Sequence, residues 1–192
     1  MAPYPLSEQM TAFVEKTVSF NSTDSSLAGL RQAYSEMCRA FTPPRPAGLY
    51  VVDFELSGVP VRSYQPPVSP PTGGAPCIVY LHGGGWVVGG LGSHDFICAE
   101  LASTLGVLVI AVDYRLAPEH PFPAAFDDCL KAWRGLRSGP FRLDPQRTLV
   151  AGDSAGGNLA AALCLALRDA GEPAPAAQVL IYPRPEYPAP PL

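Results

Sequence analysis

The chain has 192 residues, of which 47% are hydrophobic and 16% are charged, a balance typical of one folded domain with a substantial core. Its formal net charge is −4 and its lysines and arginines form no cluster, so we expect neither nucleic acid nor an anionic membrane surface as a partner. No apolar run approaches the roughly 18 residues that span a bilayer, which argues against an integral membrane segment.

Two helices are predicted near the start of the chain, within residues 7–41. The polar stretch NSTDSS (21–26) is expected to separate them. Ser7 is the expected N-cap of the first helix, and Asp24 or Ser25 that of the second, because short polar side chains accept hydrogen bonds from free helix N–H groups.

A hairpin and then a series of buried strands are predicted next. LYVVDFELSGVPVRSYQP (49–66) indicates two strands joined by a turn at Ser57-Gly58. From Cys77 onward the pattern changes to short apolar runs without polar alternation, which is typical of strands buried on both faces of a parallel sheet. These runs are CIVYL (77–81), VLVIAVD (107–113), TLVAG (148–152) and QVLIY (178–182).

Helical patterns separate these runs, so strand and helix alternate along the chain. This alternation predicts an α/β fold with a doubly wound, mostly parallel sheet flanked by helices. The predicted helices cover residues 94–105, 123–137 and 154–170.

The apolar residues of these helices predict which sides pack inward. In the first helix Ile97, Leu101 and Leu105 share a face, and Gly106 is expected to end it. The last helix is apolar on nearly every side, so we expect it to be deeply buried. The middle helix carries a stripe of Phe126, Cys129, Leu130, Trp133 and Leu136.

We therefore divide the chain into three parts. Residues 1–45 form N-terminal cap helices, 46–183 the α/β core, and 184–192 a proline-rich tail. Proline can be neither a helix interior residue nor part of a central strand, so the tail is expected to continue neither the sheet nor a helix.

The motif Gly152-Asp153-Ser154-Ala155-Gly156 fits G-x-S-x-G and lies where such a motif must, after a predicted strand and before a predicted helix. A sharp turn there pushes the serine side chain outward at the carboxyl end of a strand, where α/β sheets bind ligands. The two glycines lack a Cβ and let strand and helix pack closely. The alternative is a serine N-cap between small residues. The flanking elements favour Ser154 as a nucleophile, with the Ala155 N–H directed at developing negative charge.

A glycine-rich stretch, YLHGGGWVVGGLGSHD (80–95), follows another predicted strand. A P-loop would need lysine and serine or threonine after its second glycine, and a dinucleotide fingerprint starting at Gly83 would need glycine where Val88 stands. The remaining interpretations are a flexible loop and an HGGG loop, whose bare amides donate to a carbonyl oxygen. Its position before the G-x-S-x-G motif favours the HGGG loop, because the two motifs would then supply two parts of the same acyl-transfer site.

Three stretches resemble the hormone-sensitive-lipase-like branch of the α/β-hydrolases, the bacterial family IV esterases. They are HGGGW (82–86), DYRLAPEHPFPAA (113–125) and GDSAGGN (152–158), and the resemblance covers roughly residues 80–183. Three motifs in the order and spacing of that family make a chance match very improbable.

This resemblance implies roles for individual residues. Ser154 matches the residue that attacks the ester, and Gly84, Gly85 and Ala155 match the residues whose amides form the oxyanion hole. The N-terminal helices of such enzymes form part of a cap over the acyl site, which residues 7–41 would provide here.

The middle stretch is expected to be architectural. Asp113, Arg115 and Glu119 are predicted to tie their loop together by charge-assisted hydrogen bonds. Asp127 and Asp128 lie on the predicted helix that follows, and we expect both on its solvated face.

A base for the nucleophile is the missing element. In this fold the order is serine, then the acid, then histidine, but His82, His94 and His120 all precede Ser154 and none follows it. The resemblance gives His82 a role in orienting the glycine loop, and we expect none of the three to replace the base. Asp153 is expected to point away from the serine. The triad acid and histidine are therefore predicted to be absent from this chain.

The end of the sequence departs from the family. QVLIYP (178–183) matches the sixth strand, after which family members continue with two more strands, the acid and the histidine. The resemblance implies a C-terminally truncated chain whose sheet lacks its last strands. We expect an exposed apolar edge that favours homo-oligomers or aggregation.

Two functions follow as hypotheses. The first is a carboxylic ester hydrolase for small-molecule, short-chain acyl esters, weakly active or inactive as this chain alone. The second is a non-catalytic remnant that binds acyl compounds or other small molecules. No cofactor and no metal are expected. The five cysteines are widely spaced and the first ten residues lack a secretory signal pattern, so we expect reduced thiols and a cytoplasmic location.

Overall fold

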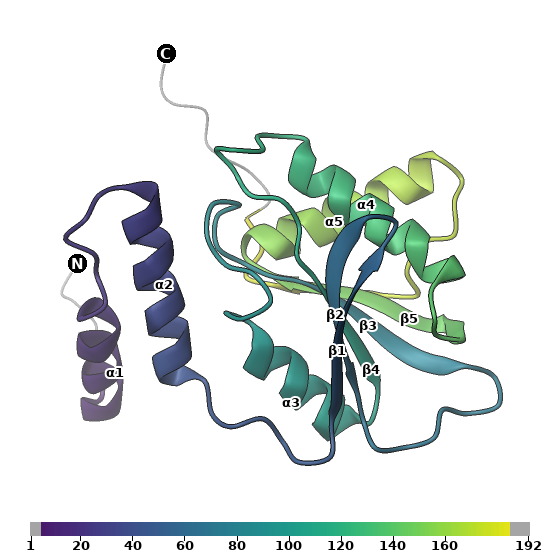
Figure 1. The fold of residues 1–192 in the computed structure, drawn as a ribbon, viewed down its shortest axis with the longest axis horizontal. Coiled ribbons are helices and arrows are strands. Elements are labelled where there is room, and N and C mark those ends of the chain that lie inside the picture. The colour runs from purple at the N-terminus through teal and green to yellow at the C-terminus, as the bar shows by residue number, and fades with distance from the viewer. Residues whose placement is uncertain (1–4, 185–192) are drawn as a thin grey trace.

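The computed structural model describes residues 5–184, so most of the predicted proline-rich tail, residues 185–192, lies outside the described part, as do residues 1–4 of the predicted cap. A six-stranded mixed sheet carries helices on both faces (Figure 1). The elements in chain order are α1 (Glu8–Val18), α2 (Leu27–Phe41), β1 (Tyr50–Leu56), β2 (Val59–Gln65), β3 (Ala75–Leu81), α3 (Asp95–Leu105), β4 (Leu108–Val112), α4 (Ala124–Gly135), a 3₁₀ turn (Leu136–Ser138), β5 (Leu143–Asp153), α5 (Ala155–Asp169) and β6 (Gln178–Ile181).

The sheet order is β1-β2-β4-β3-β5-β6. The last four strands in this order run parallel, whereas β2 is antiparallel to both of its neighbours. The α/β fold class and the predicted strands are confirmed, and β4 is buried at every position, as a strand covered on both faces should be. The β1–β2 turn also lies where predicted, with Ser57 and Gly58 at φ of 52° and 78°, the left-handed pair of a tight hairpin.

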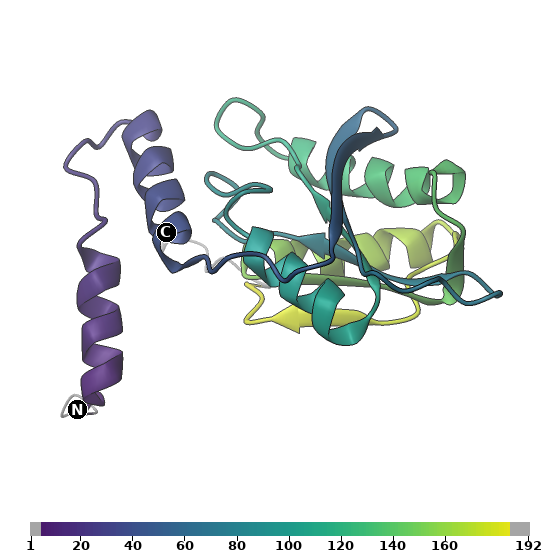
Figure 2. The same cartoon turned by 60° about the horizontal axis from the view of Figure 1, so that its bottom comes forward.

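Two apolar layers hold the helices to the sheet. On one face α4 and α5 pack against side chains such as Val79 and Ile110, with Leu163 of α5 fully buried between them. On the other face α3 packs against residues that include Tyr64 and Val109. Figure 2 shows these two layers, with α4 and α5 on one side of the sheet and α3 on the other.

The packing face of α3 differs from the face that the large apolar residues suggest. The helix buries the small residues Cys98, Ala99 and Ala102, whereas Leu105 is 56% exposed. Small side chains let the helix axis approach the sheet closely, so Ile97 and Leu101 pack only partly buried beside them. The predicted Gly106 ending is confirmed, with Gly106 in the left-handed conformation.

The prediction that α5 is buried on nearly every side is wrong on one side. Leu159, Leu163 and Leu167 face the sheet, but Leu165 on the opposite side is 51% exposed. A helix on the outer layer of a sheet has only one covered face, however apolar its sequence.

Each of the two N-terminal helices begins at a serine cap. Ser7 caps α1 as predicted, by accepting a hydrogen bond from the Met10 N–H. The cap of α2 is Ser26 rather than Asp24 or Ser25. The Asp24 carboxylate instead accepts hydrogen bonds from the backbone N–H and the hydroxyl of Ser26, both at 2.8 Å, and so supports the cap from one position away.

The edge strand β6 is poorly covered. In β6 no residue is fully buried, and Val179 is 46% exposed. The apolar edge expected from the sequence is therefore present in the described residues.

Candidate active site

The two glycine-containing motifs meet at one end of the sheet. Leu81 at the end of β3 and Gly152 near the end of β5 are direct partners in the parallel ladder. The HGGG loop leaves β3 directly after Leu81, and the serine corner leaves β5 after Asp153. The carboxyl ends of both strands thus deliver the motifs to the same place, as the fold requires of a ligand site.

Ser154 occupies a strained corner. Its φ of 51° and ψ of −115° lie outside the conformations that serine ordinarily adopts, at a cost of about 1 to 3 kcal/mol. Its backbone N–H donates to the Ile181 carbonyl at 2.9 Å. Its hydroxyl, which is partly exposed, has no hydrogen-bond partner among residues 5–184 and does not cap α5. The alternative weighed from the sequence, a serine side chain that caps the helix, is therefore not what the structure shows.

Close packing of glycines holds this corner in place. A Cβ at Gly156 would overlap the Leu81 carbonyl oxygen, and one at Gly152 would lie 2.5 Å from the Gly156 carbonyl carbon. The two glycines of G-x-S-x-G are thus required by the contact between β3, β5 and α5, as predicted.

A buried carboxylate joins the corner to the glycine loop. Asp153 accepts hydrogen bonds from the Tyr80 hydroxyl at 2.9 Å and from the Gly83 N–H at 3.0 Å. It also lies 3.2 Å from Nε2 of His94. Burial opposes ionisation of Asp153, but these hydrogen bonds outweigh it and keep the pKa of the carboxyl below its usual range. Asp153 is turned away from the serine, as predicted, and its role is to attach the loop.

The glycine loop needs left-handed backbone at two positions. Gly84 and Gly85 have φ of 122° and 59°, and a Cβ at Gly84 would overlap the Val88 carbonyl oxygen. The Val87 and Val88 amides both donate to the Gly84 carbonyl, at 3.1 and 3.0 Å. Within the described part of the chain, the Gly84 and Gly85 amides donate to no protein acceptor. Ala155 begins α5, where helix N–H groups lack an intrahelical acceptor.

His82 packs behind the loop. Its ring stacks on Tyr114 with centroids 4.2 Å apart, and its Nδ1 lies 2.7 Å from the Gly83 carbonyl oxygen. Burial lowers the pKa of His82 to about 4, so the ring is neutral near pH 7. Its Nε2 is buried without a hydrogen-bond partner in the described structure.

The other two histidines do not contact Ser154 either, although His120 lines the cavity that also borders Gly85. His94 is the residue before α3 and lies beside Asp153. His120 is exposed, in the loop between β4 and α4. Across residues 5–184 no histidine is hydrogen-bonded to Ser154, so the site as described has no base in contact with its hydroxyl.

An apolar cavity of about 600 Å³ lies next to the loop and the corner. Gly85 and Trp86 line it from the glycine loop, Phe122 and Phe126 from the region around the start of α4, and Leu159 from α5. A cavity of this size and composition suits the apolar part of a small organic molecule.

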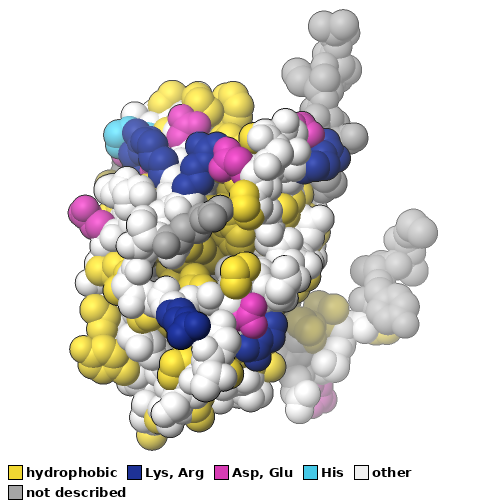
Figure 3. Space-filling view, turned by 90° about the vertical axis from the view of Figure 1, so that its right-hand side faces the viewer, with side chains coloured by type: hydrophobic (Ala, Val, Ile, Leu, Met, Phe, Trp, Pro, Cys, Tyr) yellow, Lys and Arg dark blue, Asp and Glu magenta, His cyan; other side chains and the backbone are white. Residues whose placement is uncertain are grey.

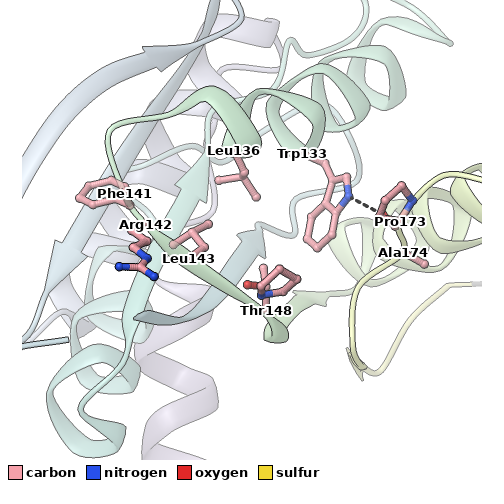
Figure 4. A pocket seen from close by; sticks show the side chains of 9 residues that line it. Trp133, Leu136, Phe141, Arg142, Leu143, Thr148, Pro173 and Ala174 are labelled. Carbon is pink, nitrogen blue, oxygen red and sulfur yellow. Dashed lines mark hydrogen bonds between the residues drawn. The ribbon is translucent and has the colours of Figure 1, made fainter. Parts of the chain in front are cut away.

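A second cavity, of about 510 Å³, lies at the opposite end of β5. Figure 3 faces this side of the molecule, where hydrophobic side chains line a hollow with charged groups around it. In Figure 4 Trp133 of α4 donates to the Pro173 carbonyl at 3.3 Å across this cavity, and Thr148 of β5 lies at its floor. None of the residues assigned to the chemistry lines it.

The middle motif is architectural, but by other pairings than expected. Asp113, Arg115 and Glu119 do not pair with one another. Arg115 forms a two-point contact with Asp128, at 2.7 and 2.8 Å. Asp128 is therefore buried rather than on the solvated face of α4, because the arginine compensates its charge.

Glu119 makes a contact that the sequence did not suggest. Its carboxylate pairs with Arg31 of α2 at 2.7 and 2.8 Å. No sequence pattern marks such a pair, since its members lie 88 positions apart.

Comparisons with known proteins agree with this geometry. A family model described as alpha/beta hydrolase fold matches residues 78–190. Over 130 residues the chain is 47% identical to the carboxylesterase NlhH of Mycobacterium tuberculosis, an alignment that covers 67% of this chain and 40% of NlhH. Over 128 residues it is 51% identical to an ethyl acetate hydrolase of Pseudomonas putida, with 65% and 40% covered. The chain thus spans about 40% of the length of these two curated relatives.

Solved structures extend the likeness beyond the motifs. A crystal structure of an esterase from the bacterial hormone-sensitive lipase (HSL) family superposes with a TM-score of 0.82 at 32% identity, covering 94% of this chain and 59% of that one. A hyperthermophilic esterase from the archaeon Pyrobaculum calidifontis gives a TM-score of 0.80 at 35% identity, with 94% and 58% covered.

Proposed function

The chain belongs to the alpha/beta hydrolase fold family, and from this premise we propose that it carries the nucleophile and oxyanion half of a carboxylic ester hydrolase of the hormone-sensitive-lipase type. The family resemblance predicted from the sequence is confirmed, since relatives and structural neighbours are named as esterases of this kind. The observation that carries the proposal is the strained conformation of Ser154 beside a loop of unoccupied glycine amides.

In the proposed reaction the Ser154 hydroxyl oxygen attacks the ester carbonyl carbon, and the carbonyl oxygen becomes an oxyanion. The amides of Gly84, Gly85 and Ala155 donate to this oxyanion, and each such donor contributes about 3 to 4 kcal/mol in a site that excludes water. The Ser154 proton passes through solvent to the leaving oxygen, the alcohol departs, and the acyl group stays on Ser154 until water releases it as a carboxylic acid and restores the hydroxyl. The position of Ala155 at the start of α5 adds the favourable field of a helix N-terminus.

Proton transfer limits the rate proposed for this polypeptide. A hydrolase of this fold uses an acid and a histidine that follow the serine in sequence, and the 192 residues contain no histidine after Ser154. Loss of the serine or the histidine of a triad costs about 10⁶ in turnover, while the oxyanion hole and binding retain roughly 10³ to 10⁴ over water. We therefore expect slow acylation of Ser154 and negligible turnover from these residues alone.

The substrate is proposed to be a small ester with an apolar group. The cavity of about 600 Å³ beside Gly85 supports this proposal, because its mainly aromatic and aliphatic lining matches an acyl or alcohol chain and includes no aspartate, glutamate, lysine or arginine among the described residues. The Pseudomonas putida relative is named for hydrolysis of ethyl acetate, a small ester.

The test is acylation with p-nitrophenyl acetate. We expect release of about one equivalent of p-nitrophenol and an acetyl group on Ser154, detected by mass spectrometry of the peptide. Ser154→Ala should abolish both, while Ser93→Ala, which alters a serine in the loop before α3, should change neither. Fast, saturable hydrolysis would contradict the expectation of negligible turnover.

A binding function is the second candidate, favoured by the lack of a base in contact with Ser154. In that case the cavity beside Gly85 would hold an acyl compound without reaction. Binding of a short-chain ester with no acetylation of Ser154 over hours would support this function against the first.

The cellular setting stays a prediction. A cytoplasmic location is proposed from the five cysteines, which are all free thiols. No helix within residues 5–184 is long and apolar enough to cross a membrane. Self-association through the β6 edge is likewise proposed, supported by the exposure of that strand.

A further inference from the structure

One arginine of α2 reaches two loops of the site. The Arg31 guanidinium donates from Nη1 and Nη2 to the two carboxylate oxygens of Glu119, at 2.7 and 2.8 Å. The same group donates from Nε to the Val87 carbonyl at 2.8 Å and from Nη2 to the Ala117 carbonyl at 3.0 Å. A planar guanidinium spreads five donors over three nitrogens in a fixed fork, so it can bind a carboxylate at two points and still reach two carbonyls, a geometry that the single nitrogen of an ammonium group lacks.

The carbonyl of Val87 belongs to the turn that shapes the glycine loop. The Val87 and Val88 amides close this turn on the Gly84 carbonyl, so the orientation of the peptide at residue 87 is coupled to that of Gly84. The second loop is attached to the first as well, because the Ala117 N–H donates to the Trp86 carbonyl at 2.8 Å. Arg31 thus contacts both loops at the point where they contact each other.

In the described structure α2 has no fully buried side chain, although Tyr34, Met37 and Cys38 are half-buried. Gly29 is the only fully buried residue of this helix among those described, and the space beside it is filled by Asp24 of the same segment. Figures 1 and 2 show α2 standing beside the loops at the carboxyl ends of the strands, away from the sheet. The connection between α2 and the site is therefore largely polar at this point.

The ion pair persists over a wide pH range. Its side chains are partly exposed, 30% for Arg31 and 49% for Glu119. The hydrogen bonds from Arg31, followed by a backbone hydrogen bond, lower the pKa of Glu119 to about 2. The carboxylate therefore stays ionised and paired with Arg31 from neutral pH down to mildly acidic pH.

We propose that Arg31 is a positioning residue for the oxyanion loop: through the Val87 and Ala117 carbonyls and Glu119 it holds the 84–88 turn, so that α2 contributes to the acyl-transfer site and not only to a cover over it. The oxyanion role of the 84–88 turn rests on the proposed function. That Arg31 holds this turn in place can be tested without any reaction. Arg31 touches no reacting atom and acts only through the backbone of the loop.

Hydrogen exchange measures directly whether Arg31 holds the 84–88 turn. In Arg31→Ala we expect the hydrogen-bonded amides of Val87, Val88 and Ala117 to exchange at least about tenfold faster than in the unaltered chain. Arg134→Ala is the matched control, since Arg134 forms a similar two-point pair with Glu172 but lies on α4, away from the loop. It should leave these three amides unchanged.

The conservative variant separates the hydrogen bonds that hold the 84–88 turn from the ion pair that attaches α2 to Glu119. Arg31→Lys keeps the charge opposite Glu119 but lacks the fork that spans the carboxylate and both carbonyls, so we expect slow exchange in α2 and fast exchange in the 84–88 turn. The proposal is overturned if Arg31→Ala speeds exchange in α2 alone and leaves Val87 and Val88 as protected as before.

Reactivity of Ser154 supplies the functional readout. With a fluorophosphonate, Arg31→Ala should lower the maximal rate of Ser154 phosphonylation about tenfold, while the probe concentration at half-maximal rate changes less than twofold. A variant that changes only the half-maximal concentration would contradict a positioning role. If the unaltered chain does not react at all, the proposed function fails, and the exchange data still decide whether Arg31 holds the loop.

Discussion

The carboxyl end of β5 and the strand β6 beside it are hydrogen-bonded neighbours, yet they are built in opposite ways. The last four residues of β5 are all buried and lead directly into the serine corner, whereas none of the four residues of β6 is fully buried. The corner packs on Leu81 and is joined to Gly83 by the Asp153 carboxylate, whereas β6 contributes a backbone contact, the Ile181 carbonyl that accepts from the Ser154 N–H. Contacts in the interior of the sheet therefore maintain the strained conformation of Ser154, which depends little on the side chains of the β6 edge.

The largest effect should come from filling the contact behind the corner. Gly156→Ala places a methyl group on the Leu81 carbonyl, which is backbone and cannot move aside, so we expect a loss of about 3 kcal/mol or more in the free energy of unfolding. Gly92→Ala is the control, because its Cβ would meet nothing within 4 Å. Urea unfolding followed by circular dichroism measures both. Equal stability of the two variants would show that the corner is not held by this contact.

The next largest effect is the pH dependence of stability that the buried His82 should cause. The pKa of His82 is about 4 in the folded chain and near 6.5 when unfolded, so between these values the unfolded chain takes up a proton that the folded chain does not. Stability should therefore fall as the pH falls from 6.5 to 4, by about 3 kcal/mol at most, and His82 should contribute no further change below that.

Substitution identifies the group responsible. His82→Phe keeps a ring on Tyr114 but removes the proton site, so the slope of unfolding free energy against pH should flatten between pH 6.5 and 4 relative to the unaltered chain. An unchanged slope in the phenylalanine variant would assign the pH dependence to other groups.

The smallest effect on stability is expected at the β6 edge. Val179→Lys introduces a charge on the exposed strand, and we expect less self-association with a change in unfolding free energy within about 0.5 kcal/mol. Leu165→Lys removes a similarly exposed apolar side chain from α5, away from the edge, and should not reduce association. Sedimentation velocity compares them. A monomeric unaltered chain at high concentration would contradict the role of the edge.

Much of the fold could be predicted because its signals are local. The short apolar runs at 77–81 and 107–113 identify buried strands from composition alone, and Gly106 marks a helix end through its own backbone preference. The serine corner was predictable for the same reason, since a strand, five motif residues and a helix follow one another in sequence.

Predictions were wrong or missing where a distant partner decides the outcome. Asp128 is buried because Arg115 compensates its charge, and periodicity along the helix carries no trace of that pair. The face of α3 was misjudged because close approach to the sheet selects Ala99 and Ala102 over the larger leucines. The contacts of Arg31 join residues up to 88 positions apart, so only the folded structure reveals them.

Reaction of Ser154 with a fluorophosphonate tests the central claim most directly. We expect the native chain to be labelled on Ser154 roughly 10³ times faster than the same chain in denaturant, because the strained corner and the loop amides exist only in the folded state. Ser154→Ala should remove the label. Labelling of Ser154 at the same rate in the native and the denatured chain would contradict the claim that this corner is built for acyl transfer.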